Sequence, residues 1–241
     1  MKRIELVPAF GIKTIYCKKN KPKEKLDISC FNNIGQHGNY IVPDMFCALK
    51  KLNKAVEKEG GTMYVIDLFR DWDTQAKGRK LYETKKKEDF VAKPGNSFHN
   101  AGRAVDIAVN KLNYSDTDKN EWLQKFWDQC KPLGFHPIIK IPELETSESW
   151  HFDFPGKVWD DAYKSLPYAE VAKCAVLDVG KWDPGENIDK IKNMFVQSQL
   201  IRLGYYSIGK VDGIIGPKTR QILSQYYNSD IENFIKCFTE L

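Results

Sequence analysis

Two histidines and one aspartate are the residues of this 241-residue chain whose types best suit chemistry at a metal ion. His99 and Asp106 lie in the stretch SFHNAGRAVDIAV, and His151 lies in ETSESWHFDF. Two imidazole nitrogens and one carboxylate oxygen form a common ligand set of catalytic zinc, in which water takes the fourth position. Bound zinc makes that water more acidic and can polarise a carbonyl group. If the three side chains converge, the sequence predicts metal-assisted hydrolysis.

A carboxylate close to His151 is the candidate general base. Glu148 precedes His151 by three residues and could accept a proton from the attacking water. In an unbroken strand, however, these two side chains would point to opposite faces. We therefore predict a bend or bulge between Glu148 and His151, and regular pairing from Ser147 to His151 would count against this assignment.

Three strands and three helices are predicted around these residues from the spacing of apolar side chains. The strands are Met63 to Leu68, Ala104 to Val109 and Trp150 to Phe154. A helix from Pro43 should stop at Gly60-Gly61, another should cover Thr74 to Asp89, and a third around Trp122 to Cys130 should end before Pro132. Asp106 and His151 then project from rigid strands.

Other readings of the same residues remain open. A lone histidine is more often a hydrogen-bonded core or surface group than a ligand. His37 and His136 have no ligand-like neighbours, although His136 could approach the pocket from its position before the final strand. Asp153 is expected to be an exposed strand residue, and the alternative is a hydrogen bond that supports the ligand His151.

Two motifs resemble a known family of zinc peptidases. SFHNAGRAVD fits the pattern S-x-H-x-x-G-x-A-x-D, and ESWH fits E-x-W-H, as in the D-alanyl-D-alanine carboxypeptidase and L-alanyl-D-glutamate endopeptidase family. The resemblance implies that His99, Asp106 and His151 are zinc ligands and that Glu148 is the general base.

Supporting positions of the same family are also matched. Ser97 resembles a supporting residue that also lines the substrate site, and Gly102 would allow a tight turn without a Cβ clash. The segment LFRDWDTQ is similar to the family's substrate-binding segment. It implies that Arg70 binds a substrate carboxylate or the developing oxyanion and that Gln75 orients the substrate. The plain alternative for Arg70 is a surface ion pair with Asp71 or Asp73.

A second resemblance covers the C-terminal part of the chain. VQSQLIRLGYYSIGKVDGIIGPKTRQILSQYY is similar to a peptidoglycan-binding domain, with Tyr227 where that family often has glutamine. The matching residues are Gln197, Leu200, Leu203, Gly204, Tyr205, Asp212, Gly213, Gly216, Pro217, Thr219 and Arg220. One helix is predicted from Ile188 to Leu203, a second up to Tyr227, and a short third from Asp230.

These observations predict an α+β fold with two domains. Residues 1–178 would form the zinc peptidase domain, a small antiparallel sheet with flanking helices, and residues 1–40 would be an N-terminal extension. A linker at 179–187, rich in turn residues, would lead to a small all-α three-helix peptidoglycan-binding domain at 188–241. Tethering the enzyme to its polymer would raise its local concentration.

Composition is typical of an ordinary folded protein. The net charge of +5 is mild and the lysine clusters are interrupted, which argues against a nucleic-acid-binding surface. No apolar run suits membrane insertion, and the N-terminus lacks a signal-peptide core, so we expect cytoplasmic synthesis. The six scattered cysteines give no zinc knuckle or disulfide framework.

The predicted function is zinc-dependent hydrolysis of an amide bond in the stem peptides of bacterial peptidoglycan, by a monomer. Carboxypeptidase and endopeptidase action both fit. The protein would reach the wall as a phage endolysin after lysis, or as an antibacterial effector through a dedicated secretion machine. The alternative is a non-catalytic, zinc-containing protein that only binds the cell wall.

Overall fold

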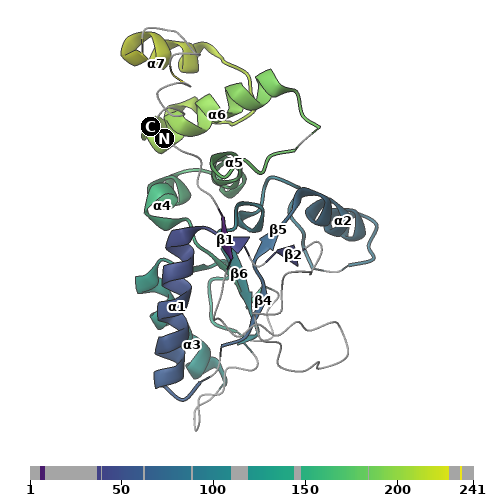
Figure 1. Ribbon diagram of the computed structural model, residues 1–241, viewed down its shortest axis with the longest axis vertical. Coiled ribbons are helices and arrows are strands. Elements are labelled where there is room, and N and C mark those ends of the chain that lie inside the picture. The colour runs from purple at the N-terminus through teal and green to yellow at the C-terminus, as the bar shows by residue number, and fades with distance from the viewer. Residues whose placement is uncertain are drawn as a thin grey trace.

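The fold is centred on a small antiparallel sheet. We describe it from a computed structural model, which covers residues 6–8, 37–38, 40–61, 63–87, 89–109, 119–143, 148–183, 185–227 and 234. Four strands pair in the order β4-β6-β8-β7, with β6 and β8 at the centre; β4 and β6 are labelled in Figure 1. Their bounds are β4 (Val65–Asp67), β6 (Ala104–Ile107), β7 (His136–Pro137) and β8 (His151–Asp153). The three predicted strands are confirmed at their centres.

Four further strands, each two residues long, pair outside this sheet. They are β1 (Val7–Pro8), which pairs with β3 (Tyr40–Ile41), and β2 (His37–Gly38), which pairs with β5 (Phe69–Arg70). The predicted N-terminal extension falls mostly on residues that the structure does not describe.

Helices lie on two sides of the sheet and beyond one end of it (Figure 1). The α-helices are α1 (Pro43–Lys58), α2 (Trp72–Glu83), α3 (Lys119–Cys130), α4 (Gly156–Ser165), α5 (Tyr168–Asp178), α6 (Ile188–Arg202) and α7 (Pro217–Tyr227). Short 3-10 helices are η2 (Phe98–Ala101), η4 (Lys131–Leu133) and η5 (Tyr206–Ile208). Among these described helices, none has the length and apolar character needed to cross a membrane.

Helices α1 and α3 pack together and bury one face of the sheet. Helix α1 starts with proline at its first turn, where a missing N–H is tolerated. Phe126 of α3 meets Phe152 of β8 edge-on, with ring centroids 5.4 Å apart. Val105 and Ile107 of β6 are also fully buried in this core. The apolar side chains of β6 and β8 thus fix the sheet against these helices. The polar residues Asp106 of β6 and His151 of β8 can then form a site.

Helix α2 differs from its predicted range in a way that local capping explains. It begins at Trp72 because the side chain of Asp71 accepts a hydrogen bond from the backbone N–H of Thr74 at 2.7 Å. It ends at Glu83, and Lys85 then adopts a positive φ of 55°. The predicted helix continued to Asp89, beyond this turn.

Helices α4 and α5 were not predicted. Helix α5 buries an almost unbroken run of residues, Val171, Ala172, Cys174, Ala175, Val176 and Leu177. Because it is covered on most sides, it has no polar stripe and its sequence shows no amphipathic period. It packs against α4, α6 and η2. Its position becomes clear only from the tertiary structure.

The C-terminal residues form the two longer helices that the sequence predicts, α6 and α7. The predicted third helix lies outside the described residues except for Phe234, which is buried with Val196, Leu200 and Leu223. Met194 and Ile201 of α6, however, belong to the same core cluster as the sheet. The division into two domains stays a prediction: part of the C-terminal region joins the core of the sheet, and part forms a second, smaller cluster.

Candidate metal and active site

His99 is held by a short, well-capped turn. It lies in η2, where the Ser97 side chain accepts a hydrogen bond from the His99 backbone N–H at 3.3 Å. Gly102 ends this turn in the left-handed conformation, with φ of 61°. The His99 ring is 1% exposed, and its Nδ1 contacts the carbonyl oxygen of Leu68. The other ring nitrogen, Nε2, is thereby directed away from that carbonyl.

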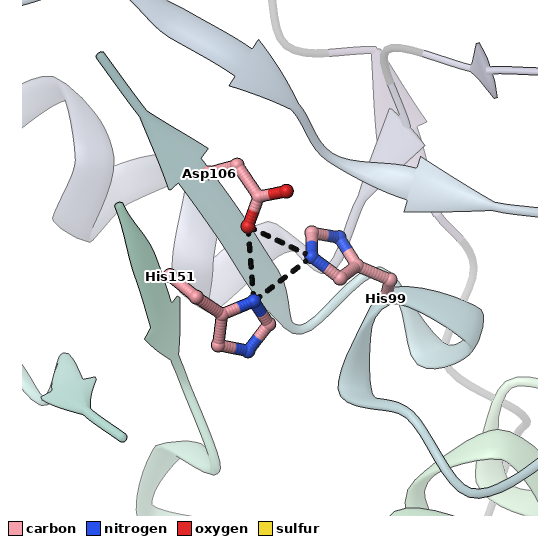
Figure 2. Close-up of side chains that lie close together, drawn as sticks. All are labelled: His99, Asp106 and His151. Carbon is pink, nitrogen blue, oxygen red and sulfur yellow. Dashed lines mark hydrogen bonds and ion pairs between the residues drawn. The ribbon is translucent and has the colours of Figure 1, made fainter. Parts of the chain in front are cut away.

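Asp106 and His151 are brought together by strand register. They are direct partners in the antiparallel pair β6–β8. The Asp106 Oδ1 atom lies 2.9 Å from Nδ1 of His151 and 3.1 Å from Nε2 of His99. The two imidazole nitrogens are 3.2 Å apart. Figure 2 shows all three side chains pointing toward one another.

This donor set suits a bound cation. The three ligand atoms lie within 4.8 Å of one another, and all three residues are buried. Two ring nitrogens and one carboxylate oxygen lie together here, and each can act as an acceptor. A single cation could bind all three atoms at once. His99, Asp106 and His151 could therefore hold a metal ion.

The carboxylates and imidazoles of this cluster shift each other's pKa values. Burial alone would raise the pKa of Asp106, but the charges and hydrogen bonds of His99 and His151 outweigh it and hold that pKa well below its usual range. Burial would lower the pKa of His151, yet Asp153 and Asp106 raise it to about 10. Both shifts show that the fold favours positive charge between these carboxylates.

Asp153 supports His151 from behind. Its side chain is fully buried, and its Oδ1 lies 3.0 Å from His151 Nε2. Tyr163 donates a hydrogen bond to Oδ2 at 2.9 Å, and Tyr168 donates one to Oδ1 at 3.2 Å. Burial and the Asp153 charge raise the pKa of both tyrosines, so their hydroxyls stay protonated donors. The prediction of an exposed Asp153 was wrong, because its side chain is buried and contacts His151.

Arg70 lies beside the cluster in a fixed orientation. Its Nε and Nη2 donate to one carboxylate oxygen of Asp67, at 3.0 and 2.6 Å, and its Nη1 donates to Gln75 at 3.1 Å. Its Nη2 is 3.6 Å from Asp106. The Gln75 amide also donates to the carbonyl oxygen of Ala92 at 2.7 Å. Arg70 thus pairs with Asp67, and Gln75 is buried beneath it.

Glu148 lies at the bend that the sequence predicts. Residues 148–150 form a turn, and β8 starts only at His151. Glu148 has a positive φ of 68°, and its carbonyl oxygen accepts the His151 backbone N–H at 3.0 Å. Burial raises the pKa of its carboxyl group, while the nearby His151 opposes this. The predicted break before His151 is confirmed.

The other predicted positions lie around this cluster in different ways. Ser97 is 5% exposed and caps η2, and Gln75 is 1% exposed with its amide bound to protein groups. Their contact with substrate stays a prediction. His136 is a partner of Asp153 across β7–β8, and its ring lies 5.2 Å from that of Tyr163. The side chain of His37 lies outside what the structure describes.

Sequence reasoning missed Asp67, Tyr163 and Tyr168. Asp67 precedes Arg70 by three residues at a strand end, and this proximity was a usable signal. The two tyrosines gave no signal, because they lie on helices that were not predicted.

Comparison with known proteins gives a consistent family assignment. The family described as VanY, D-alanyl-D-alanine carboxypeptidase, matches residues 38–157. YodJ of Bacillus subtilis (strain 168), provisionally named a carboxypeptidase, is 30% identical over 134 residues, which cover 49% of this chain. The chain spans about half of YodJ, 47% of its length.

Two further proteins are similar over longer stretches. The bifunctional D-Ala-D-Ala dipeptidase and D-Ala-D-Ala carboxypeptidase VanXYC of Enterococcus gallinarum is 27% identical over 172 residues, 64% of this chain and 81% of that protein. The solved structure of the LD-carboxypeptidase LdcB covers 71% of this chain and 78% of its own, with a TM-score of 0.44 and 22% identity. Through residues 38–157, which contain all three candidate metal ligands and Glu148, the chain belongs to the VanY D-alanyl-D-alanine carboxypeptidase family.

Proposed function

We propose that this protein is a zinc-dependent peptidase that hydrolyses an amide bond in the stem peptides of bacterial peptidoglycan. The observation that carries the proposal is the convergence of His99, Asp106 and His151, with Glu148 on the adjoining turn. The relatives named as carboxypeptidases support the reaction class. The residues would hold zinc through His99 Nε2, Asp106 Oδ1 and His151 Nδ1.

The protein's own groups divide the remaining tasks. When bound, zinc supplies a Lewis acid that makes water more acidic and polarises the substrate carbonyl. Glu148 accepts the proton from the attacking water and later returns it to the leaving amine. Burial raises the pKa of the Glu148 carboxyl group above its usual range. This makes Glu148 a stronger base than an exposed glutamate, as proton transfer near neutral pH requires.

Arg70 stabilises the negative charge that develops on the substrate oxygen. A guanidinium carries five N–H donors. In the part of the chain that the structure describes, three of them bond to Asp67 and Gln75. The other two, one on each terminal nitrogen, can bond to a substrate carboxylate or to the developing oxyanion. Gln75 then acts on the substrate through Arg70.

The C-terminal part is proposed to bind the wall. Gln197 holds the turn at Asp212 and Gly213 by accepting both backbone N–H groups, at 3.0 and 2.8 Å. Beside this turn lies a cleft of ≈ 550 Å³ lined by Gln197, Ile214 and Thr219 among others. Co-sedimentation of the protein with insoluble peptidoglycan tests this binding. Action as a phage endolysin or an exported effector, as a monomer, is part of the same proposal.

Digestion of purified peptidoglycan tests the peptidase activity. The wild-type protein with Zn²⁺ should release new amino groups, and Glu148→Gln should reduce the rate by about 10²- to 10⁴-fold while still binding zinc. Mass spectrometry of the products identifies the bond: loss of a terminal residue indicates a carboxypeptidase, and an internal cut indicates an endopeptidase. No amine release by either protein would contradict the proposal and favour the non-catalytic wall binder.

A further inference from the structure

We propose that Tyr163 and Tyr168 are positioning residues that set the metal affinity of the site. Their hydroxyl groups hold Asp153, and their rings hold the segment that carries His99. The inference rests on the proposed function, because it takes His99, Asp106 and His151 as the metal ligands. It adds an outer layer of support that comes from the α4–α5 helix pair.

The first step of the argument is the environment of Asp153. Its carboxylate is fully buried, and three donors surround it: Tyr163 on one oxygen, and His151 and Tyr168 on the other. Burial of a carboxylate is costly unless hydrogen-bond donors satisfy its oxygens. The two tyrosine hydroxyls therefore bond to both oxygens of Asp153 and fix its side chain at this place in the fold.

The second step is what a fixed Asp153 does to His151. An acceptor 3.0 Å from Nε2 requires a proton on that nitrogen. The ring then presents Nδ1, unprotonated in the neutral form, toward Asp106 and His99. Hydrogen bonds of this kind orient metal-binding histidines and select their tautomer. Loosening Asp153 would let the His151 ring rotate or exchange tautomers.

The third step concerns the other histidine. Phe98, the neighbour of His99, packs against both tyrosines, with ring centroids 5.6 Å from Tyr163 and 5.5 Å from Tyr168. The backbone of Phe98 also hydrogen-bonds the Tyr168 hydroxyl. The residue Tyr168 is 38% exposed, yet its hydroxyl reaches inward to the fully buried Asp153. The two tyrosines thus contact Asp153, which bonds to His151, and Phe98, which precedes His99.

These tyrosines lie outside the part of the chain that matches the carboxypeptidase family. The match ends at residue 157, whereas Tyr163 is in α4 and Tyr168 is the first residue of α5. Helix α5 also packs against η2 and against α6. Support for the metal site is therefore supplied by the segment that joins the family domain to the C-terminal helices.

Metal affinity, measured without any substrate, tests the inference. The double variant Tyr163→Phe/Tyr168→Phe keeps both rings and removes both hydroxyls. Competition with a chromophoric chelator should show Zn²⁺ bound about 10- to 100-fold more weakly than in the wild type. The visible spectrum of the Co²⁺-loaded protein should change as well. Tyr40→Phe is the matched control, since the Tyr40 side chain is 48% exposed, and should bind like the wild type.

Folding is checked separately by near-UV circular dichroism and thermal unfolding of the metal-free proteins. Weaker binding by a double variant that unfolds at the wild-type temperature supports the inference, and the single variant Tyr163→Phe serves if the double variant does not fold. Affinity and Co²⁺ spectrum equal to those of the wild type would overturn the inference while the proposed function stands. A wild-type protein that binds neither metal would overturn both.

Discussion

Asp67 gives Arg70 a fixed direction at the edge of the site. Two guanidinium nitrogens bond to one carboxylate oxygen, and a third bonds to Gln75. Such a planar fork cannot be replaced by an ammonium group, which is a point charge on a flexible chain. Orientation, as well as positive charge, is therefore the property of Arg70 that should matter for catalysis.

Replacement of Arg70 by lysine tests this at the residue scale. We expect Arg70→Lys to lower kcat/KM on stem peptides by about 10²- to 10³-fold, the usual effect of removing one oxyanion donor. Zinc affinity should stay close to the wild-type value, because Arg70 lies outside the proposed ligand set. The control is Arg79→Lys on α2, whose guanidinium bonds to Glu83 and to the carbonyl oxygen of Val91. An unchanged rate in Arg70→Lys would remove Arg70 from the mechanism.

The sequence predicted the candidate metal ligands but not the residues that support them. Two short segments that match family motifs contain these residues: His99 and Asp106 in one, Glu148 and His151 in the other. Residue type and order along the chain were therefore enough to predict them as candidates. Asp153 has the same local appearance as any strand aspartate. Its role depends on hydroxyl groups that arrive from α4 and α5, and such contacts follow from packing rather than from local pattern.

At the scale of elements, the turn that carries His99 depends on Gly102. It has φ of 61°, and a Cβ atom there would lie 2.9 Å from Leu6 Cδ2 and 3.2 Å from Ile41 Cα. Both the backbone conformation and the close approach of the segment around Ile41 therefore require glycine. The sequence predicted the turn, and only the structure shows which segment approaches it.

A glycine-to-alanine comparison separates these two causes. Gly60→Ala places a side chain in open space at φ of 76°, so it should cost only the conformational strain, about 1–2 kcal/mol of unfolding free energy. Gly102→Ala adds steric overlap, which should cost a further ~1–3 kcal/mol. Urea unfolding of the metal-free proteins measures both values. Equal losses for the two variants would show that the contact with Ile41 is unimportant.

At the scale of the whole molecule, the two predicted domains are joined through α5. Met194, Ile201 and Val211 belong to the core cluster that contains the sheet. Polar contacts cross the same junction: Arg202 pairs with Asp178 at 3.2 Å, and the backbone N–H of Val211 donates to Glu170 at 2.7 Å. The turn-rich composition of residues 179–187 indicated a linker, but composition does not report how tightly the flanking parts pack.

This shared core predicts one cooperative unfolding transition for the chain. Ile201→Ala, at a fully buried position of α6, should lower the unfolding free energy of the whole transition by about 2–5 kcal/mol. Leu203→Ala, at the end of the same helix and 48% exposed, should change it by less than about 0.5 kcal/mol. Calorimetry that resolves two transitions, with only one shifted by Ile201→Ala, would instead show independent domains.

Anomalous X-ray diffraction at the zinc absorption edge, from crystals grown with Zn²⁺, tests the proposed metal centre most directly. The arrangement of His99, Asp106 and His151 predicts one strong peak bounded by Nε2, Oδ1 and Nδ1 of these residues, in that order. The absence of a peak there, or imidazole rings turned away from each other, would contradict the proposal.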